Sequence, residues 1–234
     1  LGYIKSCLGD ELLTSQWFGD DDGVWVRKTT PTNDAEENKQ IVIITPSYRL
    51  QNIKKTYESI DFTNVLRWII VYDGKHVKEN PLLFEDNPKI EEYVYEGESC
   101  WGNGQRNYGL DKADMLLLTT KFFIYFLDDD NIMHPDFDKI ISKLEYGHIY
   151  TFDQKRLGED DVIESGGVLR GNKIKKKCID TAQFIGDFSL IRDLRWRTDV
   201  YQADFFYIQE CCIKNYKVHE YIPLVACYWN YLPK

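Results

Sequence analysis

The six apolar or aromatic residues 122–127 run directly into three consecutive acids. These acids are Asp128, Asp129 and Asp130. An apolar run of this length that stops at charged residues is typical of a buried strand. Three neighbouring carboxylates repel one another unless a cation lies among them. Oxygen-rich clusters suit Mg²⁺ or Mn²⁺, which bind one or two protein carboxylates and take further ligands from water and phosphates. An acidic turn before a helix that begins near Pro135 is the simpler interpretation.

Short apolar runs alternate with amphipathic segments between residues 41 and 145. Runs at 41–44, 68–72, 93–95 and 122–127 predict strands, and segments at 50–60, 105–118 and 137–144 predict helices. This alternation predicts an α/β fold with a mainly parallel central sheet and helices on both faces. Ligands of such sheets bind beyond the carboxyl ends of the strands. Because Tyr48, Asp73 and the three acids follow strand ends, we expect them to form one site.

Domain organisation follows from a change in composition near residue 40. We interpret residues 1–39 as a leader, or as the tail of a preceding domain, joined by a polar linker. Residues 40–234 are expected to form one domain, with a nucleotide-binding half at 40–131 and a smaller mixed half at 132–234. In that second half, strands are predicted at 148–152, at 162–163 and within 218–228, and a helix is predicted at 201–213. Because the chain begins at Leu1 and not at Met, we expect it to be part of a longer protein.

Composition restricts the partners and the compartment. A net charge of −9 argues against a nucleic-acid-binding surface and favours a polyhydroxyl partner, or an anion held through a metal. The six cysteines form no CxxC pair, so neither a zinc site nor a disulfide framework is expected. Free thiols indicate a reducing compartment and therefore a cytoplasmic location. The sequence contains no apolar stretch long enough for a membrane span and no signal peptide.

Three residues near the predicted strand ends have two interpretations each. Tyr48 is placed to stack on a nucleotide base or to be an exposed turn residue. Asp73 is placed to accept a hydrogen bond from a base or to form an Asx-turn beside Gly74. Arg106, at a predicted helix N-terminus, is placed to bind a phosphate or to remain a surface arginine.

Four segments in this order resemble the GT-A-fold glycosyltransferases, most closely the family 2 type. They are Ile-Ile-Thr-Pro-Ser-Tyr at 43–48, Val-Tyr-Asp-Gly at 71–74, Gly-Gln-Arg-Asn-Tyr-Gly-Leu at 104–110, and Phe-Leu-Asp-Asp-Asp-Asn at 126–131 followed by His134 and Pro135. The resemblance covers about residues 40–145. It is specific for the fold and less specific for the sugar or the linkage.

The resemblance implies a soluble, metal-dependent hexosyltransferase. It would move a sugar, with inversion, from a nucleotide-sugar donor (most often UDP-linked) to a hydroxyl group of a glycan or other acceptor, with Mn²⁺ or Mg²⁺ bound. The resemblance implies that Pro46 and Tyr48 line the base pocket, that Asp73 recognises the base, and that Arg106 lies near the donor phosphates or sugar. Asp128 and Asp130 would form the metal-binding DxD pair, with Asp130 as the direct ligand. Asp129 would contact the ribose or the donor sugar.

The resemblance also implies a late carboxylate that acts as catalytic base. Asp204, within Gln-Ala-Asp-Phe at 202–205, matches it best, although the first acid of the family's Glu-Asp pair is missing. Asp187, Asp199 and Glu210 are rival carboxylates for the role. His219 is either a third metal ligand or a structural residue on a strand, and the structural role is the more common one.

Two other functions fit parts of the sequence. A sugar-nucleotide pyrophosphorylase has the same α/β layout and also uses a metal. It would need a glycine-rich loop with a basic partner directly after the first strand. Residues 45–50, which follow that strand, contain no glycine. A catalytically degenerate domain that binds a nucleotide or glycan within a larger protein is the alternative without catalysis.

Overall fold

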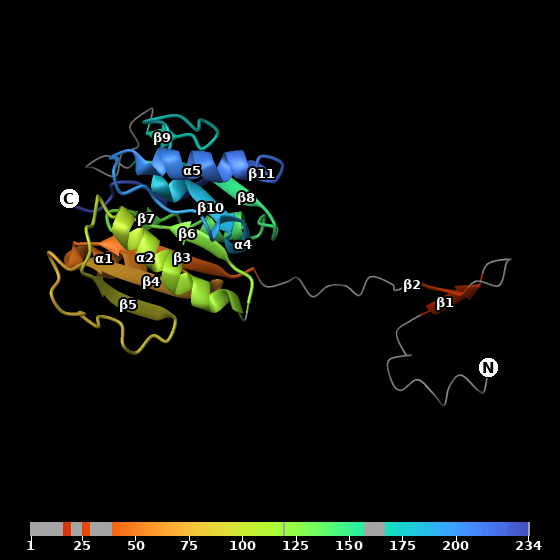
Figure 1. The fold of residues 1–234 in the computed structure, drawn as a ribbon, viewed down its shortest axis with the longest axis horizontal. Helices are drawn as coiled ribbons and strands as arrows, with labels where there is room; N and C mark the ends of the chain where they lie inside the picture. Colours follow the sequence, from red (N-terminus) through yellow and green to blue (C-terminus); the bar gives the residue numbers. More distant parts are fainter. Residues whose placement is uncertain (1–15, 20–24, 29–38, 119, 157–166, 234) are drawn as a thin grey trace. The chain divides into compact units, whose positions relative to one another are not determined.

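The computed structural model describes residues 16–19, 25–28, 39–118, 120–156 and 167–233. The chain divides into two compact units, Leu1–Asn38 and Lys39–Lys234. In the first unit, β1 (Gln16–Gly19) pairs antiparallel with β2 (Trp25–Lys28). The second unit contains the other described elements (Figure 1). The strand predicted at 162–163 lies outside the described residues.

A nine-stranded sheet organises the second unit, in the spatial order β5-β4-β3-β6-β10-β8-β11-β7, with β9 paired to β8. The strands are β3 (Ile41–Ser47), β4 (Val65–Asp73), β5 (Ile90–Tyr95), β6 (Phe123–Phe126), β7 (Ile132–Met133), β8 (Ile149–Lys155), β9 (Val168–Leu169), β10 (Phe184–Asp187) and β11 (His219–Tyr228). Strands β5, β4, β3 and β6 are mutually parallel, as are β8 and β11. The Rossmann-like α/β fold with its mainly parallel sheet is therefore confirmed.

The apolar strand runs are buried on both faces, which explains why they are continuous. Successive side chains of β3 alternate between two cores: Ile41 and Ile43 belong to one, Val42 and Ile44 to the other. Helices α1 (Leu50–Glu58) and α3 (Phe137–Ile141) contribute to the first core. Helices α2 (Asn103–Asp114), α4 (Phe188–Ile191) and α5 (Ala203–Lys214) contribute to the second. Helices therefore cover both faces of the sheet (Figure 1).

Several features differ from the sequence-based expectations, including one helix end and one strand inside the sheet. The helix predicted at 105–118 is an α-helix only to Asp114, and Met115–Leu118 continue it as a 3-10 turn, a common form at helix ends. Strand β10 inserts antiparallel between β6 and β8, so the parallel order ends at β6. Its four residues are too few to give a periodic pattern, and for that reason the sequence did not predict it.

We predict that Gly109→Ala destabilises the chain, because α2 packs directly on Ile44 of β3 at this glycine. A Cβ atom at this position would lie 2.6 Å from Cγ2 of the buried Ile44. Overpacking costs about 1–3 kcal/mol, which exceeds the gain of up to about 1 kcal/mol in helix propensity. Urea denaturation measures the difference in the free energy of unfolding. Asp111→Ala on the exposed side of α2 is the control, expected within about 0.5 kcal/mol of wild type, and a Gly109→Ala chain as stable as wild type would contradict the packing argument.

Candidate active site at the strand ends

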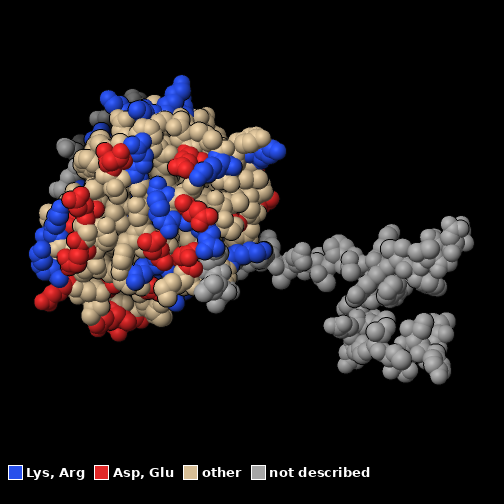
Figure 2. Space-filling model, viewed as in Figure 1, with Lys and Arg blue, Asp and Glu red and all other residues tan. Residues whose placement is uncertain are grey.

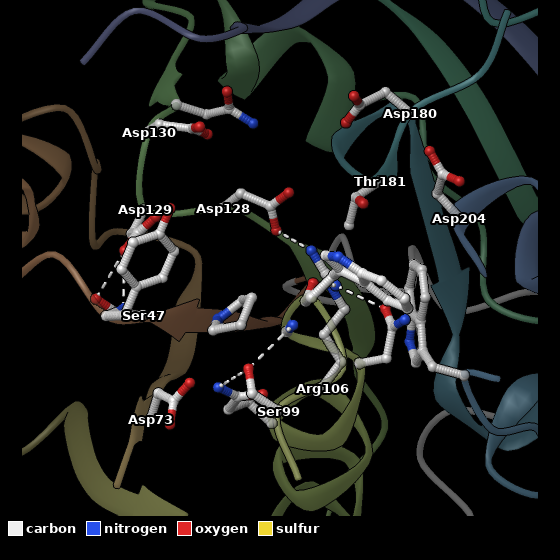
Figure 3. Close-up of a pocket in the computed structure, with 18 of the residues that line it drawn as sticks. Ser47, Asp73, Ser99, Arg106, Asp128, Asp129, Asp130, Asp180, Thr181 and Asp204 are labelled. Atoms are coloured by element: carbon white, nitrogen blue, oxygen red, sulfur yellow. Dashed lines mark hydrogen bonds and ion pairs between the residues drawn. The ribbon is translucent and has the colours of Figure 1, made fainter. Parts of the chain in front are cut away.

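A cavity of about 740 Å³ lies at the carboxyl ends of β3, β4 and β6 (Figure 3). The eight residues that the sequence analysis selected all line it: Pro46, Tyr48, Asp73, Arg106, Asp128, Asp129, Asp130 and Asp204. The parallel strands bring six of them to one edge of the sheet, α2 brings Arg106, and α5 brings Asp204 from the second half of the chain. The fold thus places these side chains around one cavity, and their chemical roles stay predictions.

Asp129 is the buried member of the three acids, with only 2% of its surface exposed. Its carboxylate accepts hydrogen bonds from Ser47 Oγ at 3.0 Å, and from the backbone N–H groups of Tyr48 and Arg49, each at 3.1 Å. The Arg49 guanidinium forms an ion pair with the same carboxylate. Burial raises the pKa of Asp129, against the lowering effects of Arg49 and these hydrogen bonds. Through these contacts Asp129 joins two strand-end loops, and its expected contact with the ribose or donor sugar stays a prediction.

Arg106 connects the acidic segment to α2. Its Nη2 donates to Asp128 Oδ1 at 2.5 Å, and its Nη1 donates to the backbone oxygen of Trp101 at 3.2 Å. The guanidinium also lies over the Trp196 ring, 4.8 Å from its centroid. Because Arg106 is 5% exposed, it is a buried member of the cavity wall. The sequence alternative of a surface arginine is wrong.

Tyr48, Asp73 and His76 lie together at another part of the cavity. The Tyr48 side chain is 48% exposed, and its ring lies beside His76 and under the Arg49 guanidinium. Asp73 is buried, and its Oδ1 accepts a hydrogen bond from Lys75 N at 2.9 Å, which is the expected Asx-turn. Asp73 still faces the cavity (Figure 3), so the turn and a contact with a ligand are compatible.

Two carboxylates, Asp180 and Asp204, lie on the wall beyond Asp128 (Figure 3). Burial, followed by the charges of Asp128 and Asp204, raises the pKa of Asp180 to about 7 against the opposing effect of Arg106. Burial also raises the pKa of Asp204, whose Oδ1 accepts a hydrogen bond from Phe205 N at 2.8 Å. Carboxylates with raised pKa values in a cavity are typical of sites for proton transfer.

The rival carboxylates are not among the residues that line this cavity. Asp187 is the N-cap of α4, and its Oδ1 accepts a hydrogen bond from Ser189 N at 2.9 Å. Asp199 is paired with Arg197 at the surface, and Glu210 is paired with Lys214. His219 lies 3.1 Å from Thr151 Oγ1 on the neighbouring strand, which is the structural role.

Sequence reasoning missed Arg49 and Asp180. Arg49 directly follows the first strand-end segment, and its guanidinium pairs with Asp129 and lies 3.6 Å from Asp130. Asp180 stands just before the 3-10 turn η3 (Thr181–Gln183), and its backbone N–H donates to Gln183 Oε1 at 2.9 Å. The Asp-x-x-Gln spacing of a helix start was the available signal, and it indicates only local structure.

The residues of the cavity fit a divalent cation that takes most of its ligands from a substrate. In the part of the chain that the structure describes, no group of three or more His, Cys, Asp or Glu side chains is arranged to hold a metal ion. Oδ1 of Asp128 accepts a hydrogen bond from Arg106, and the Asp129 carboxylate accepts hydrogen bonds from the loop after β3. Asp130 and the second oxygen of Asp128 are the protein ligands that fit. Mg²⁺ and Mn²⁺ sites with one or two carboxylates are completed by phosphates and water.

Comparison with known proteins identifies the fold. No family model and no curated protein matches the chain. Among solved structures, the chain is similar to the inositol-1-phosphate CTP transferase from T. maritima, with a TM-score of 0.50, 15% identity, and coverage of 81% of this chain and 87% of that chain. It also matches 4-diphosphocytidyl-2C-methyl-D-erythritol synthase (TM-score 0.47, 10% identity, 83% and 92% covered) and HddC from Yersinia pseudotuberculosis (TM-score 0.45, 16% identity, 80% and 91% covered).

At these identities the similarity to the T. maritima structure establishes an α/β nucleotide-binding fold and no particular activity. These matches do not single out the family 2 glycosyltransferases that the motifs resemble. In the described residues, no helix has the length and apolar character needed to cross a membrane.

We predict that Asp180→Asn changes how stability depends on pH. The unfolded chain releases this proton near pH 4, whereas the native chain keeps it to about pH 7. Protonation of Asp180 therefore favours the native state at low pH, and that advantage is lost as the pH rises from about 4 to 7. Relative to wild type, Asp180→Asn should gain up to about 4 kcal/mol across this range.

Urea denaturation between pH 4 and 8, with EDTA present, measures this difference. The matched control is Asp199→Asn, because Asp199 is exposed and its pKa is lowered by the Arg197 hydrogen bond. Its difference from wild type should stay constant over the same range. Parallel curves for Asp180→Asn and wild type would refute the raised pKa.

Proposed function

We propose that this chain binds a nucleoside-diphosphate sugar together with Mg²⁺ or Mn²⁺, and transfers the sugar to a hydroxyl group of a glycan or other acceptor. One observation carries the proposal. A carboxylate with a raised pKa, Asp204, shares a cavity with the strand-end acids Asp128 and Asp130. Transfer to a hydroxyl needs both a base for its proton and a group that stabilises the leaving diphosphate.

The donor is assigned to the strand-end side of the cavity. The exposed ring of Tyr48, with Pro46, offers a surface on which a base can stack, and Asp73 offers an acceptor for a base N–H group. The diphosphate would lie near Arg106, with Asp130 and Asp128 as metal ligands. A bound divalent cation would neutralise the charge that develops on the leaving diphosphate oxygen. Asp129 keeps the loop in place and needs no contact with the donor.

The acceptor is assigned to the side of Asp204. In the proposed reaction the acceptor oxygen forms a bond to C1 of the sugar, the bond from C1 to the diphosphate oxygen breaks, and the acceptor proton goes to the Asp204 carboxylate. A single displacement of this kind inverts the configuration at C1. A raised pKa makes Asp204 a stronger base than an ordinary carboxylate, since basicity increases with pKa.

Nucleotidyl transfer is the second candidate, favoured by the similarity to the inositol-1-phosphate CTP transferase structure. It would use the same cavity for a nucleoside triphosphate and a sugar phosphate. Two features weigh against it. A phosphate nucleophile is already ionised and leaves Asp204 without a proton to remove. The cavity also has six aspartates against the three cationic side chains of Arg49, Arg106 and Lys177, whereas acids and bases are interspersed on the face shown in Figure 2.

We predict that Asp130→Asn lowers metal-dependent turnover by about 10²–10³, the usual effect of removing one electrostatic stabiliser from a site. The assay is the release of UDP or GDP from a panel of nucleotide sugars, with Mn²⁺ or with EDTA. Calorimetry with UDP and Mn²⁺ should show the same loss in binding. Asp86→Asn, at an exposed loop position, is the control and should behave as wild type. Turnover that needs no metal and survives Asp130→Asn would remove the proposal.

We predict that Asp204→Asn lowers kcat by about 10²–10⁴ while the affinity for UDP and Mn²⁺ stays within about twofold, because a general base acts on the acceptor and not on the nucleotide. The wild-type rate should fall as the pH drops through the raised pKa of Asp204, since only the carboxylate accepts a proton. A larger loss in Asp180→Asn than in Asp204→Asn would transfer the role to Asp180.

The same assays separate the other functions. Release of pyrophosphate from CTP or UTP with a sugar 1-phosphate, without transfer from nucleotide sugars, would establish nucleotidyl transfer. Binding of UDP without any turnover would establish the catalytically degenerate domain.

A further inference from the structure

We infer that Trp101 and Tyr201 form an acceptor platform that binds the apolar face of a neutral pyranose ring. This inference rests on the proposed function and adds the class of acceptor to it. Both side chains line the cavity, and they are 61% and 75% exposed. Their ring centroids lie 5.5 Å apart with an interplanar angle of 83°, so one ring meets the other edge to face. They come from loops 100 positions apart, so local sequence does not bring them together.

The backbone under Trp101 is held in a conformation that a bulky residue rarely adopts. Cys100, Trp101 and Gly102 have φ values of 46°, 60° and 87°, which are three consecutive left-handed residues. Such strain persists only where the surroundings enforce it, and it concentrates at functional sites. Here Asn103 N donates to Cys100 O at 3.2 Å, and Gly104 N donates to Ser99 O at 3.1 Å. The strained loop keeps a large ring at the cavity and not in the core.

The platform is connected to the donor side of the cavity through Trp101 and to the acceptor side through Tyr201. The Trp101 carbonyl accepts a hydrogen bond from Arg106, and the same guanidinium binds Asp128. Tyr201 stands three residues before Asp204, at the start of α5. A ring stacked on the platform would therefore be held at a fixed place relative to the strand-end acids and the proposed base, and positioning of this kind is what transfer to one particular hydroxyl requires.

The chemistry of the surface favours a neutral saccharide. A pyranose has an apolar face of C–H groups and a rim of hydroxyl groups, and an aromatic ring with polar side chains around it matches both. Asp204, three residues after Tyr201, supplies a hydrogen-bond acceptor in the same cavity. The six aspartates of the cavity would also disfavour a negatively charged sugar. Trp196, by contrast, is 2% exposed, stacks on Tyr207 and belongs to the core, so it is not part of the platform.

The test is saturation-transfer difference NMR with UDP and Mg²⁺ present. The probes are methyl β-glucopyranoside, methyl β-galactopyranoside, cellobiose, lactose and maltose, with sorbitol as an acyclic polyol and glucuronate as an anion. We expect saturation of the ring C–H protons of at least one neutral pyranoside. The apparent affinity should fall about tenfold or more in Trp101→Gly and Tyr201→Ala, and stay near wild type in Trp101→Phe.

Trp101→Gly removes the ring and tolerates the left-handed backbone, so loss of the fold is not expected to confuse the result. Tyr216→Ala is the matched control, because Tyr216 is 70% exposed and is not among the cavity residues. Unchanged saturation in Trp101→Gly, a preference for glucuronate or sorbitol, or no binding by any probe would overturn the platform. Calorimetry with UDP and Mg²⁺ tests the donor site separately. If the wild-type chain does not bind UDP, the proposed function is rejected. If Trp101→Gly binds both UDP and the saccharide as well as wild type does, only the platform is rejected.

Discussion

The buried carboxylate of Asp129 is the interaction on which the arrangement of the site depends. It holds the end of β3 against the segment after β6, through Ser47, two backbone N–H groups and the Arg49 guanidinium. Removing one partner of a buried pair typically costs about 3–5 kcal/mol, because a charge is then left without compensation. With the middle acid turned into the protein, Asp128 and Asp130 border the cavity (Figure 3). The three acids are thus one structural anchor and two cavity residues, which the proposed function uses as metal ligands.

Arg106 extends this organisation to the second half of the chain. Its guanidinium binds Asp128 and the Trp101 carbonyl, and it lies over Trp196, whose ring stacks on Tyr207 of α5 at 4.3 Å between centroids. The helix that carries Asp204 is therefore packed, through two aromatic rings, against the side chain that orients the strand-end acid. These contacts connect the strand-end acids to the helix that carries the proposed base.

Much of this arrangement could be predicted from the sequence because it depends on local patterns. The apolar runs of β3, β4 and β6 indicate buried parallel strands, and their polar ends must meet at one edge of the sheet. Partners that are distant in sequence could not be predicted. Nothing near Arg49 indicates that it pairs with Asp129, and nothing near Asp180 indicates that β10 would bring it beside Asp204. The same limit left His219 with two possible roles until its contact with Thr151 was known.

Raised carboxylate pKa values and a strained backbone segment are found together at this cavity. Asp129, Asp180 and Asp204 all have raised pKa values, so each opposes folding at neutral pH relative to an ordinary carboxylate. The left-handed backbone at residues 100–102 adds strain at the same place. Elsewhere in the second unit, strands and helices bury apolar faces as their patterns predict. Carboxylates that oppose folding and a strained loop at the same cavity indicate that their cost is retained for a functional reason. Two of the residues concerned, Asp129 and Asp204, are also residues that the family resemblance indicated.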